Sequence, residues 1–280
     1  MRKSIKKVIP SLLFPVVEKG LAALGLVQRD TFRRRMLDRF IVEHQGMSLP
    51  ERETTFRHEV LIPCYNHGRF LPGVLESLRD KKVQVTIIND ASTDTTAACI
   101  AELQRAHVFK LITNEHNLLQ FGSLNKAIEQ SDSNLFTVLN ADDFLLPGWL
   151  DYAENVFETT SVSLLGGARI NFQGEVGNDV ALAKIVRSIS YLPTTAPTIY
   201  GPSDAVHFSH DNSIDMTMSG CTFLKSSWSF VDGFYPRERR TSLWDDRDFQ
   251  MRVCAFFEIG ISSEISAFYR TNSSLGLGTS

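Results

Sequence analysis

Short apolar runs alternate with amphipathic helical patterns through the middle of the chain. The apolar runs "EVLIPCYN" (59–66), "VQVTIIND" (83–90), "VFKLITN" (108–114) and "NLFTVLNADD" (134–143) have the length and composition of strands. Helical spacing follows the first three, over 68–80, 92–106 and 123–131. This alternation predicts an α/β fold with a single mixed, mostly parallel sheet flanked by helices.

The pattern of apolar and polar residues changes near residues 57 and 166, and these changes suggest that the chain has three parts. Residues 1–56 have helical patterns and end in a loop marked by Gly46 and Pro50, which predicts an N-terminal helical extension. The strand–helix alternation occupies 57–165. In 166–280 the pattern loosens: the segments 170–180 and 191–213 are rich in Gly, Pro, Ser and Asn and predict long loops, and a helical pattern returns over 243–257.

Composition narrows the possible partners. The chain has 280 residues and a formal net charge of -3, which gives no reason to expect a nucleic-acid partner. Its four cysteines are far apart and include no C-x-x-C pair, so they suggest neither a zinc site nor disulfides, and a reducing, cytoplasmic compartment fits best.

The amino terminus is the one segment that hints at a membrane. Arg2, Lys3, Lys6 and Lys7 precede an apolar run that Pro10 and Pro15 interrupt, and this run is too short to span a bilayer. One interpretation is an amphipathic segment on anionic lipid, which would make the protein peripheral on the inner face of a membrane. The other is a helical extension packed on its own domain or on another subunit of a homo-oligomer.

Polar clusters follow each of the four predicted strands. Because the carboxyl ends of parallel strands share one edge of a sheet, these clusters should form one rim, where such sheets bind ligands. Asp142 and Asp143 end the fourth strand. One explanation is that Asp142 binds Mn2+ or Mg2+, which prefer carboxylate oxygens; the other is that both acids cap the turn before Pro147.

Two further groups of residues carry candidate chemistry. A tyrosine such as Tyr65 can stack on a nucleotide base, and Asp90 can accept a hydrogen bond from an imide N–H; alternatively they are a buried aromatic and a capping acid. Asp245, Asp246 and Asp248 begin a predicted helix, where helix capping explains them fully. A carboxylate there could also accept a proton from an alcohol. No P-loop or G-x-G-x-x-G motif follows any strand.

Five segments, taken in order, resemble family 2 glycosyltransferases of the A-type nucleotide-sugar fold. They are "LIPCYNHGRFLPGVLESL", "TIINDASTDTT", "NEHNLLQFGSLNKAI", "VLNADDFLLPGWL" and "WDDRDFQMRV", and the resemblance covers about Arg57 to Arg270. It implies metal-dependent, inverting transfer of a sugar from a nucleotide-diphosphate donor, often a UDP-sugar, to a hydroxyl of a glycan or lipid-linked acceptor. The family also leads us to expect a role in bacterial cell-surface polysaccharide synthesis. The half 57–165 would bind the nucleotide-sugar, and 166–280 would bind the acceptor and supply the catalytic base.

The resemblance assigns a role to each matching residue. Donor-binding positions are Pro63, Tyr65, Asn66, Asp90, Asn117, Asn125, Asn140, Ala141 and Asp142. Asp142 would also hold the cation, and Asp246 would be the catalytic base. Asp143, Asp245 and Arg270 would support the site.

Three departures from the family pattern leave alternatives open. Asn140 replaces an acid, Leu119 replaces a usual Gly, and Leu124 stands where a basic residue often meets the phosphates. A non-catalytic sugar- or nucleotide-binding protein of the same fold is therefore the main alternative, and a nucleotidyltransferase of related fold is another. A glycosidase is not supported, because no barrel pattern accompanies these acids.

Overall fold

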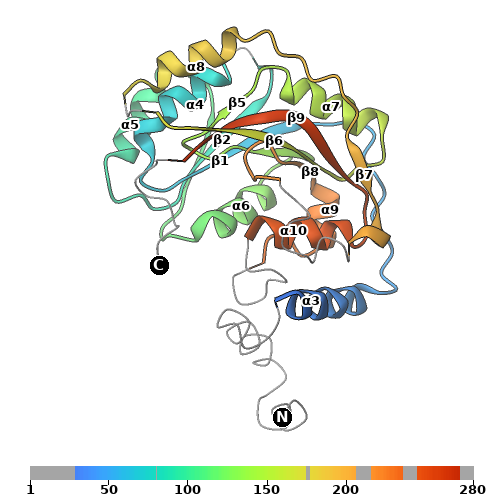
Figure 1. Cartoon of the computed structure of the whole chain (residues 1–280). Coiled ribbons are helices and arrows are strands. Elements are labelled where there is room, and N and C mark those ends of the chain that lie inside the picture. The colour runs from blue at the N-terminus through green and yellow to red at the C-terminus, as the bar shows by residue number, and fades with distance from the viewer. Residues whose placement is uncertain (1–28, 80, 175–176, 206–215, 236–244, 272–280) are drawn as a thin grey trace.

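The computed structural model describes residues 29–79, 81–174, 177–205, 216–235 and 245–271 (Figure 1). Its strands are β1 (His58–Cys64), β2 (Gln84–Asn89), β3 (Lys110–Thr113), β4 (Leu135–Val138), β5 (Phe144–Leu145), β6 (Leu164–Phe172), β7 (Thr198–Tyr200), β8 (Thr222–Leu224) and β9 (Ile259–Arg270). Its α-helices are α3 (Arg29–His44), α4 (Leu71–Ser77), α5 (Thr96–Leu103), α6 (Leu119–Glu129), α7 (Trp149–Thr159), α8 (Asp179–Ser188), α9 (Lys225–Phe230) and α10 (Asp245–Cys254). Short 3-10 turns are η1 (Gly68–Phe70) and η2 (Pro202–Asp204).

One mixed sheet runs through the molecule in the order β3-β2-β1-β4-β8-β6-β9-β5, and β7 pairs with β9. The strands β3, β2, β1 and β4 are parallel, and β8 is antiparallel to both β4 and β6. The predicted α/β fold is confirmed, with the parallel strands where the sequence alternates strand and helix. Because β6 crosses residues 165 and 166, the two predicted halves contribute to one continuous sheet.

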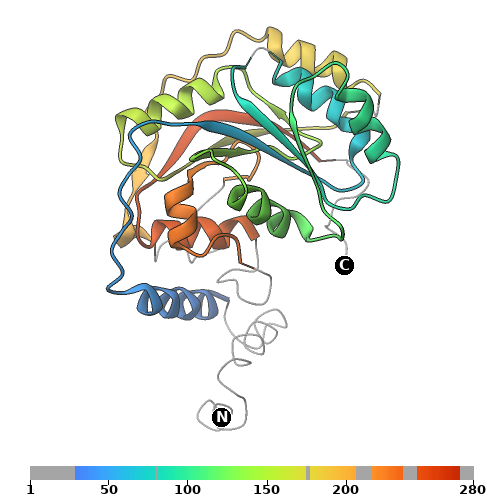
Figure 2. The same ribbon diagram turned by 180° about the vertical axis from the view of Figure 1, so that it is seen from behind.

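Helices cover both faces of the sheet (Figures 1 and 2). Successive side chains of a strand point to opposite faces, so Val60 and Ile62 of β1 pack under α4 and α7, whereas Leu61 packs with α6 and α10. Both faces of β1 are therefore buried, which explains its nearly continuous apolar sequence.

The described part of the N-terminal extension is α3 and the segment 45–56 that follows it, and α3 lies against α10 (Figure 1). Leu37 and Phe40 are buried in the same core as α10, and the Phe40 ring contacts Tyr235 and Phe256 edge to face. The segment that begins with Arg2 lies outside the described residues. Within the described residues, no helix is both long and apolar enough to cross a bilayer.

The C-terminal half is more regular than its sequence predicts. The segment 170–180 was expected to be a loop, but residues 170–172 complete β6 and Asp179 begins α8. Residues 198–200 in the second expected loop form β7. Both errors concern elements whose pairing partners are distant in sequence: β6 and β7 each pair with β9, which supplies the missing hydrogen bonds.

Candidate functional site

The polar residues that follow β1, β2, β3 and β4 lie along one edge of the sheet, as the sequence predicts. Backbone hydrogen bonds link neighbouring strand ends directly: the Asp90 N–H donates to the Cys64 carbonyl at 2.9 Å, and the Asn114 N–H donates to the Asn89 carbonyl at 2.9 Å. On the other side of β1, the Leu139 N–H donates to the Leu61 carbonyl at 3.0 Å. The loops after these strands therefore leave the sheet side by side.

Asp90 is buried, and its neighbours fix its orientation. Its Oδ1 accepts hydrogen bonds from Asn114 Nδ2 and from the Leu118 N–H, both at 2.8 Å. Lys126 Nζ in turn donates to Asn114 Oδ1 at 2.9 Å. Within the described residues Oδ2 of Asp90 takes no hydrogen bond, so one oxygen of a held carboxylate is available to a ligand. Asn114 was not among the predicted site residues, although it begins the polar cluster "NEHN".

The loop after β1 presents Tyr65 and holds the loop after β2. Tyr65 is 41% exposed, so its ring can accept a flat ligand, and Pro63 lies partly exposed in β1. The side chain of Asn66 faces the protein instead: its Oδ1 accepts hydrogen bonds from the backbone N–H groups of Thr93 and Asp94. Asn66 adopts φ 55°, a left-handed conformation that Asn tolerates better than most residues. Its observed contacts position the neighbouring loop.

Asp143 is buried with its carboxylate fully engaged. Its Oδ2 accepts from the Ser219 hydroxyl and from Asn140 Nδ2, and its Oδ1 accepts from the Arg270 N–H at 2.8 Å. Burial raises the pKa of Asp143 to about 7, and the neighbouring charge of Asp142 adds to this rise. Asp143 therefore joins the turn after β4 to the end of β9.

Asp142 differs sharply from its neighbour. It is 9% exposed, yet within the described residues its carboxylate accepts no hydrogen bond. An ionised carboxylate in such a place is costly unless a cation or a hydrogen-bond donor compensates it. The preceding Ala141 is buried, and Asn140 is held by Gln120 Nε2 at 2.9 Å and by Asp143. In the turn 140–143, Asp142 thus has the carboxylate that is open to a ligand.

Arg270 supports this turn from behind. Its Nε donates to the Asp142 carbonyl at 3.1 Å, its Nη1 donates to the Gly174 carbonyl at 2.9 Å, and its Nη2 forms an ion pair with Asp179. The guanidinium also lies over the ring of Phe172, 4.6 Å from the centroid. All these contacts are within the protein, so Arg270 holds the turn that contains Asp142 and Asp143.

Asp246 lies in the first turn of α10 and is partly buried. Burial raises its pKa, while a hydrogen bond from the Arg247 N–H and the charges of Arg247 and Arg169 oppose the rise. A carboxylate with a raised pKa is a better proton acceptor than an ordinary aspartate. The side chain of Asp245 lies outside what the structure describes.

Tyr269 lies half-buried in β9, next to Arg270. Burial raises its pKa, and the charges of Asp143, Asp142 and Asp246 add to the rise while the charge of Arg169 opposes it. Arg169 lies over the Tyr269 ring, 5.6 Å from its centroid. The sequence analysis assigned no role to Arg169 or Tyr269, because β6 and β9 become neighbours only in the folded sheet.

Three other positions have mainly structural contacts. Asn125 was expected to bind the donor, but its amide pairs with the backbone of Phe234 in both directions, at 2.8 and 2.9 Å, and accepts from Trp228 Nε1. Asn117 is exposed and its Oδ1 accepts from the Leu119 N–H at 2.8 Å. Leu124 is fully buried in the core beneath the sheet, so this side chain does not face the rim.

The residues present are compatible with a divalent cation. Mg2+ and Mn2+ often take one or two protein carboxylates and complete their coordination with water and substrate phosphates. The free carboxylate of Asp142 meets that requirement, although within the described residues no group of three His, Cys, Asp or Glu side chains could hold a cation alone. Nearby, Nε2 of His67 is buried and has no hydrogen-bond partner within the described residues. Burial lowers the pKa of His67, and the Asp142 charge opposes this, so the two groups are close.

Fold and site together define an α/β protein with a polar rim at the carboxyl edge of its parallel strands, where the carboxylate of Asp142 accepts no hydrogen bond within the described residues. The family model described as glycosyl transferase family 2 matches residues 59–214. The chain belongs to this family, which confirms the resemblance seen in the sequence.

Curated relatives match shorter stretches. An uncharacterised Mycobacterium tuberculosis protein is 32% identical over 108 residues, which are 38% of this chain and 34% of that protein. The poly-beta-1,6-N-acetyl-D-glucosamine synthase of Staphylococcus epidermidis is 34% identical over 85 residues, 29% of this chain and 21% of the synthase. The matched stretch therefore spans about a third or less of the length of either relative.

Solved structures show the same fold at low sequence identity. The crystal structure of S. aureus TarS 1-349 in complex with UDP-GlcNAc superposes with a TM-score of 0.58 at 15% identity, covering 78% of this chain and 59% of that chain. The mannosyltransferase PcManGT from Pyrobaculum calidifontis, in complex with GDP-Man and Mn2+, gives a TM-score of 0.50 at 14% identity and covers 91% of this chain and 66% of that protein.

Proposed function

We propose that this protein transfers a sugar from a nucleotide-diphosphate donor, a UDP-sugar, to a hydroxyl group of a glycan or lipid-linked acceptor, with inversion at the anomeric carbon. The observation that carries the proposal is the contrast between Asp143, whose carboxylate is fully hydrogen-bonded, and Asp142, whose carboxylate is free within the described residues. A fold gains nothing from an uncompensated acid at a strand end, whereas a site for a metal–diphosphate requires one.

The nucleotide would occupy the rim after β1 and β2. Uracil presents an imide N–H, and the free Oδ2 of Asp90 is an acceptor held in place by Asn114 and Leu118. The exposed ring of Tyr65 offers a stacking surface beside it. A divalent cation, Mn2+ or Mg2+, would be held by Asp142 and would neutralise charge on the diphosphate when bound.

Asp246 would act on the acceptor. Its carboxylate takes the proton from the acceptor hydroxyl while that oxygen forms a bond to the anomeric carbon. The bond from the anomeric carbon to the diphosphate oxygen breaks in the same step, and the electron pair leaves with the nucleoside diphosphate. One displacement inverts the configuration. The raised pKa of Asp246 supports this role, as does the influence of both the Asp142 and the Asp246 charge on the pKa of Tyr269.

The relatives suggest which donors to test first. One curated relative is named for N-acetyl-D-glucosamine and one neighbouring structure holds UDP-GlcNAc, so UDP-N-acetylglucosamine is the first candidate. GDP-mannose is the second, from the archaeal neighbour. We place the acceptor among bacterial cell-surface polysaccharides or their lipid-linked precursors, made on the cytoplasmic side.

Calorimetry tests the proposal at the level of binding. UDP and GDP are titrated into the protein with Mn2+ and again with EDTA, and the titrations are repeated with Asp142→Ala and with Asp151→Ala, an exposed acid on α7, as the matched control. We expect metal-dependent UDP binding that only Asp142→Ala abolishes. Binding without transfer from any donor would instead favour a non-catalytic nucleotide-binding protein, and no nucleotide binding at all would overturn the proposal.

A further inference from the structure

The outer face of α8 exposes apolar side chains that nothing in the described structure covers. Ile185 is 62% exposed, and Leu192, just after the helix, is 77% exposed; Val180 and Ile189 are also exposed. Another face of the same helix is buried, because Ala183 and Val186 pack on Phe144. Single exposed apolar residues are ordinary, but Ile185 together with Ile189 and Leu192 in the segment just after α8 makes an exposed apolar cluster, which marks a contact surface.

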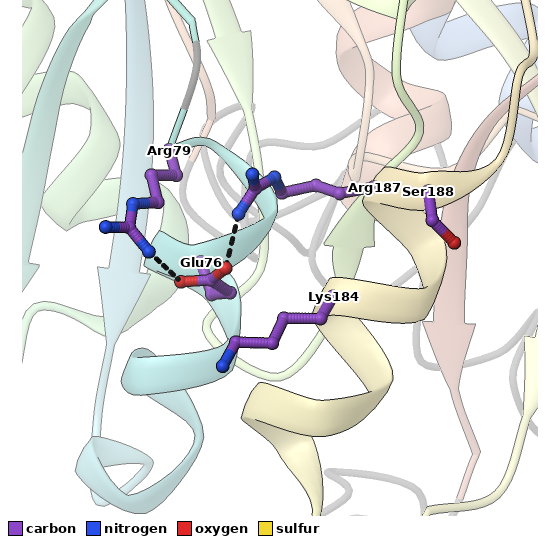
Figure 3. A pocket seen from close by; sticks show the side chains of 5 residues that line it. All are labelled: Glu76, Arg79, Lys184, Arg187 and Ser188. Atoms are coloured by element: carbon purple, nitrogen blue, oxygen red, sulfur yellow. Dashed lines mark hydrogen bonds and ion pairs between the residues drawn. The ribbon is translucent and has the colours of Figure 1, made fainter.

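Cationic side chains lie next to this apolar row. A cavity of about 310 Å3 between α4 and α8 is lined by Glu76, Arg79, Lys184, Arg187 and Ser188 (Figure 3). Glu76 forms ion pairs with both Arg79 and Arg187, so its single negative charge is shared by two guanidinium groups. Lys184 reaches from α8 toward α4 and has no ion pair within the described residues (Figure 3). Lys184 therefore adds a positive charge to the cavity beyond the two guanidinium groups that Glu76 pairs with.

Helical geometry places the two features side by side. Successive residues of an α-helix are rotated by about 100°, so Lys184, Arg187 and Ser188 form a cationic stripe. Ile185 begins an apolar stripe beside it, which Ile189 continues just after the helix ends at Ser188. The cationic stripe borders the cavity, and the apolar stripe faces outward beside it. A helix with cationic and apolar stripes adjacent on its exposed side has the character of an interfacial helix.

We infer that α8 rests on an anionic lipid bilayer, with Ile185, Ile189 and Leu192 among the upper acyl chains and Lys184 and Arg79 at the lipid phosphates. The anionic bilayer is inferred because its charge is complementary to that of the α8 surface. Phosphates of an anionic bilayer satisfy the positive cavity while the adjoining hydrocarbon accepts the apolar row. In a contact between two copies of this surface, the cationic stripes would add repulsion.

This contact has a consequence for the proposed transfer reaction. Asp179, the first residue of α8, pairs with Arg270, which donates to the Asp142 carbonyl. A helix of 10 residues is about 15 Å long, so a bilayer under α8 would hold a lipid-linked acceptor close to the rim. This consequence rests on the proposed function, whereas the lipid contact itself does not.

The location of α8 also separates this contact from the one expected at the amino terminus. α3 and α8 lie on opposite sides of the sheet (Figures 1 and 2). The α8 surface and a segment docked beside α3 would therefore face different directions. Substitutions in the two regions can distinguish the two contacts.

Vesicle co-sedimentation of the full chain tests the inference. The vesicles contain either phosphatidylcholine alone or phosphatidylcholine with phosphatidylglycerol, and no donor or acceptor is present. We expect binding only to the anionic vesicles, and a loss of at least about tenfold in affinity for Lys184→Glu and for Ile185→Ser with Leu192→Ser. Val108→Ser and Val42→Ser, which change exposed apolar residues elsewhere, are the matched controls and should bind as wild type. Thermal unfolding confirms that each variant is folded.

Four outcomes would overturn the inference. The first is equal binding to both kinds of vesicle. The second is anionic-vesicle binding that survives the α8 substitutions but is lost when Arg2, Lys3, Lys6 and Lys7 are replaced by Ser. The third is glycerol phosphate releasing the protein from vesicles at millimolar concentration, which would make the cavity a site for free phosphates. The fourth is a lipid-free dimer that Ile185→Ser dissociates. Asp142→Ala separates the two claims. We expect it to bind anionic vesicles as wild type does even if it no longer transfers sugar, because vesicle binding tests only the lipid contact and transfer tests only the proposed function.

Discussion

The carboxylate of Asp179 and the guanidinium of Arg270 form an ion pair in which both side chains are almost completely buried. One residue begins α8 and the other ends β9, so the pair joins a surface helix to the strand that closes the site. Arg270 also contacts both acids of the turn: its Nε donates to the Asp142 carbonyl, and its backbone N–H donates to the Asp143 carboxylate. The position of Asp142, the candidate cation ligand, thus depends on Arg270 and on its ion pair with Asp179, which lies outside the rim.

Replacing Asp179 should destabilise the protein. Asp179→Asn leaves Arg270 without its charge partner in a buried position, and we expect the free energy of unfolding to fall by about 3 kcal/mol. Asp151→Asn removes an acid from the exposed pair with Lys81 and should change it by less than about 1 kcal/mol. Urea unfolding of the two variants measures the difference. Equal effects would contradict the buried pair.

Neighbouring acids in the turn after β4 should respond in opposite ways to substitution. Asp142→Asn removes a buried charge that accepts no hydrogen bond within the described residues and that lies beside Asp143, so we expect equal or higher thermal stability. Asp143→Ala leaves Ser219 and the Arg270 N–H without their acceptor and should cost about 2 kcal/mol. Calorimetric unfolding in EDTA compares them. A loss of stability in both variants would mean that Asp142 is structural.

Asp246 should govern the dependence of transfer on pH. Only its ionised form can accept the proton of the acceptor, and burial raises its pKa, so kcat/KM should fall as the pH drops through a value above that of an ordinary aspartate. Asp246→Asn should lower kcat by about 100-fold or more and leave UDP affinity in Mn2+ unchanged. Transfer assays from pH 4 to 9 measure the profile. Full activity in the variant would remove Asp246 from the mechanism.

Asn125 offers a test between a structural and a donor-binding role. Its amide is paired with the Phe234 backbone and with Trp228, so Asn125→Ala should lower the free energy of unfolding by about 2 kcal/mol. UDP affinity, measured by calorimetry on the folded variant, should stay within about twofold of wild type. A protein with wild-type stability and weakened UDP binding would restore the donor-binding role expected from the sequence.

Leu119 carries a backbone conformation that suits glycine better. Its φ is 61° and its side chain is 65% exposed, so a glycine would relieve strain and lose little burial. We expect Leu119→Gly to unfold at a higher temperature than Leu119→Ala, by the equivalent of about 0.5–1 kcal/mol. At Leu118, whose φ is -94°, the same comparison should favour alanine. The reverse order at Leu119 would show that the strain is absent.

The parts of the fold that follow from local pattern were predictable. Four strands, the helices between them and the shared rim follow from side-chain periodicity and from the rule that parallel strands end together. The order of β8, β6 and β9 was not predictable, because their pairing depends on contacts far apart in sequence. The helix α8 was missed because glycines precede it and a Pro-rich segment follows it.

In the candidate site, too, some residues were predictable from the sequence and the contacts that hold them were not. Asp142 and Asp90 stand directly at predicted strand ends, and the structure places both there with an oxygen free of hydrogen bonds from the described residues. The partners that hold them are distant residues such as Ser219 and Arg270. Sequence pattern identifies which groups have the right chemistry; only the fold shows which are already occupied, as with Asn66 and Asn125.

The position of β9 within the sheet affects the order in which the chain can fold during its synthesis. It follows every other described strand in the sequence, yet it lies inside the sheet between β6 and β5 and also pairs with β7. While the chain is still on the ribosome, β6 lacks this partner and Asp143 lacks the Arg270 N–H. Folding during synthesis can therefore assemble the four parallel strands early, whereas the turn that carries Asp142 can settle only after residue 270 has emerged.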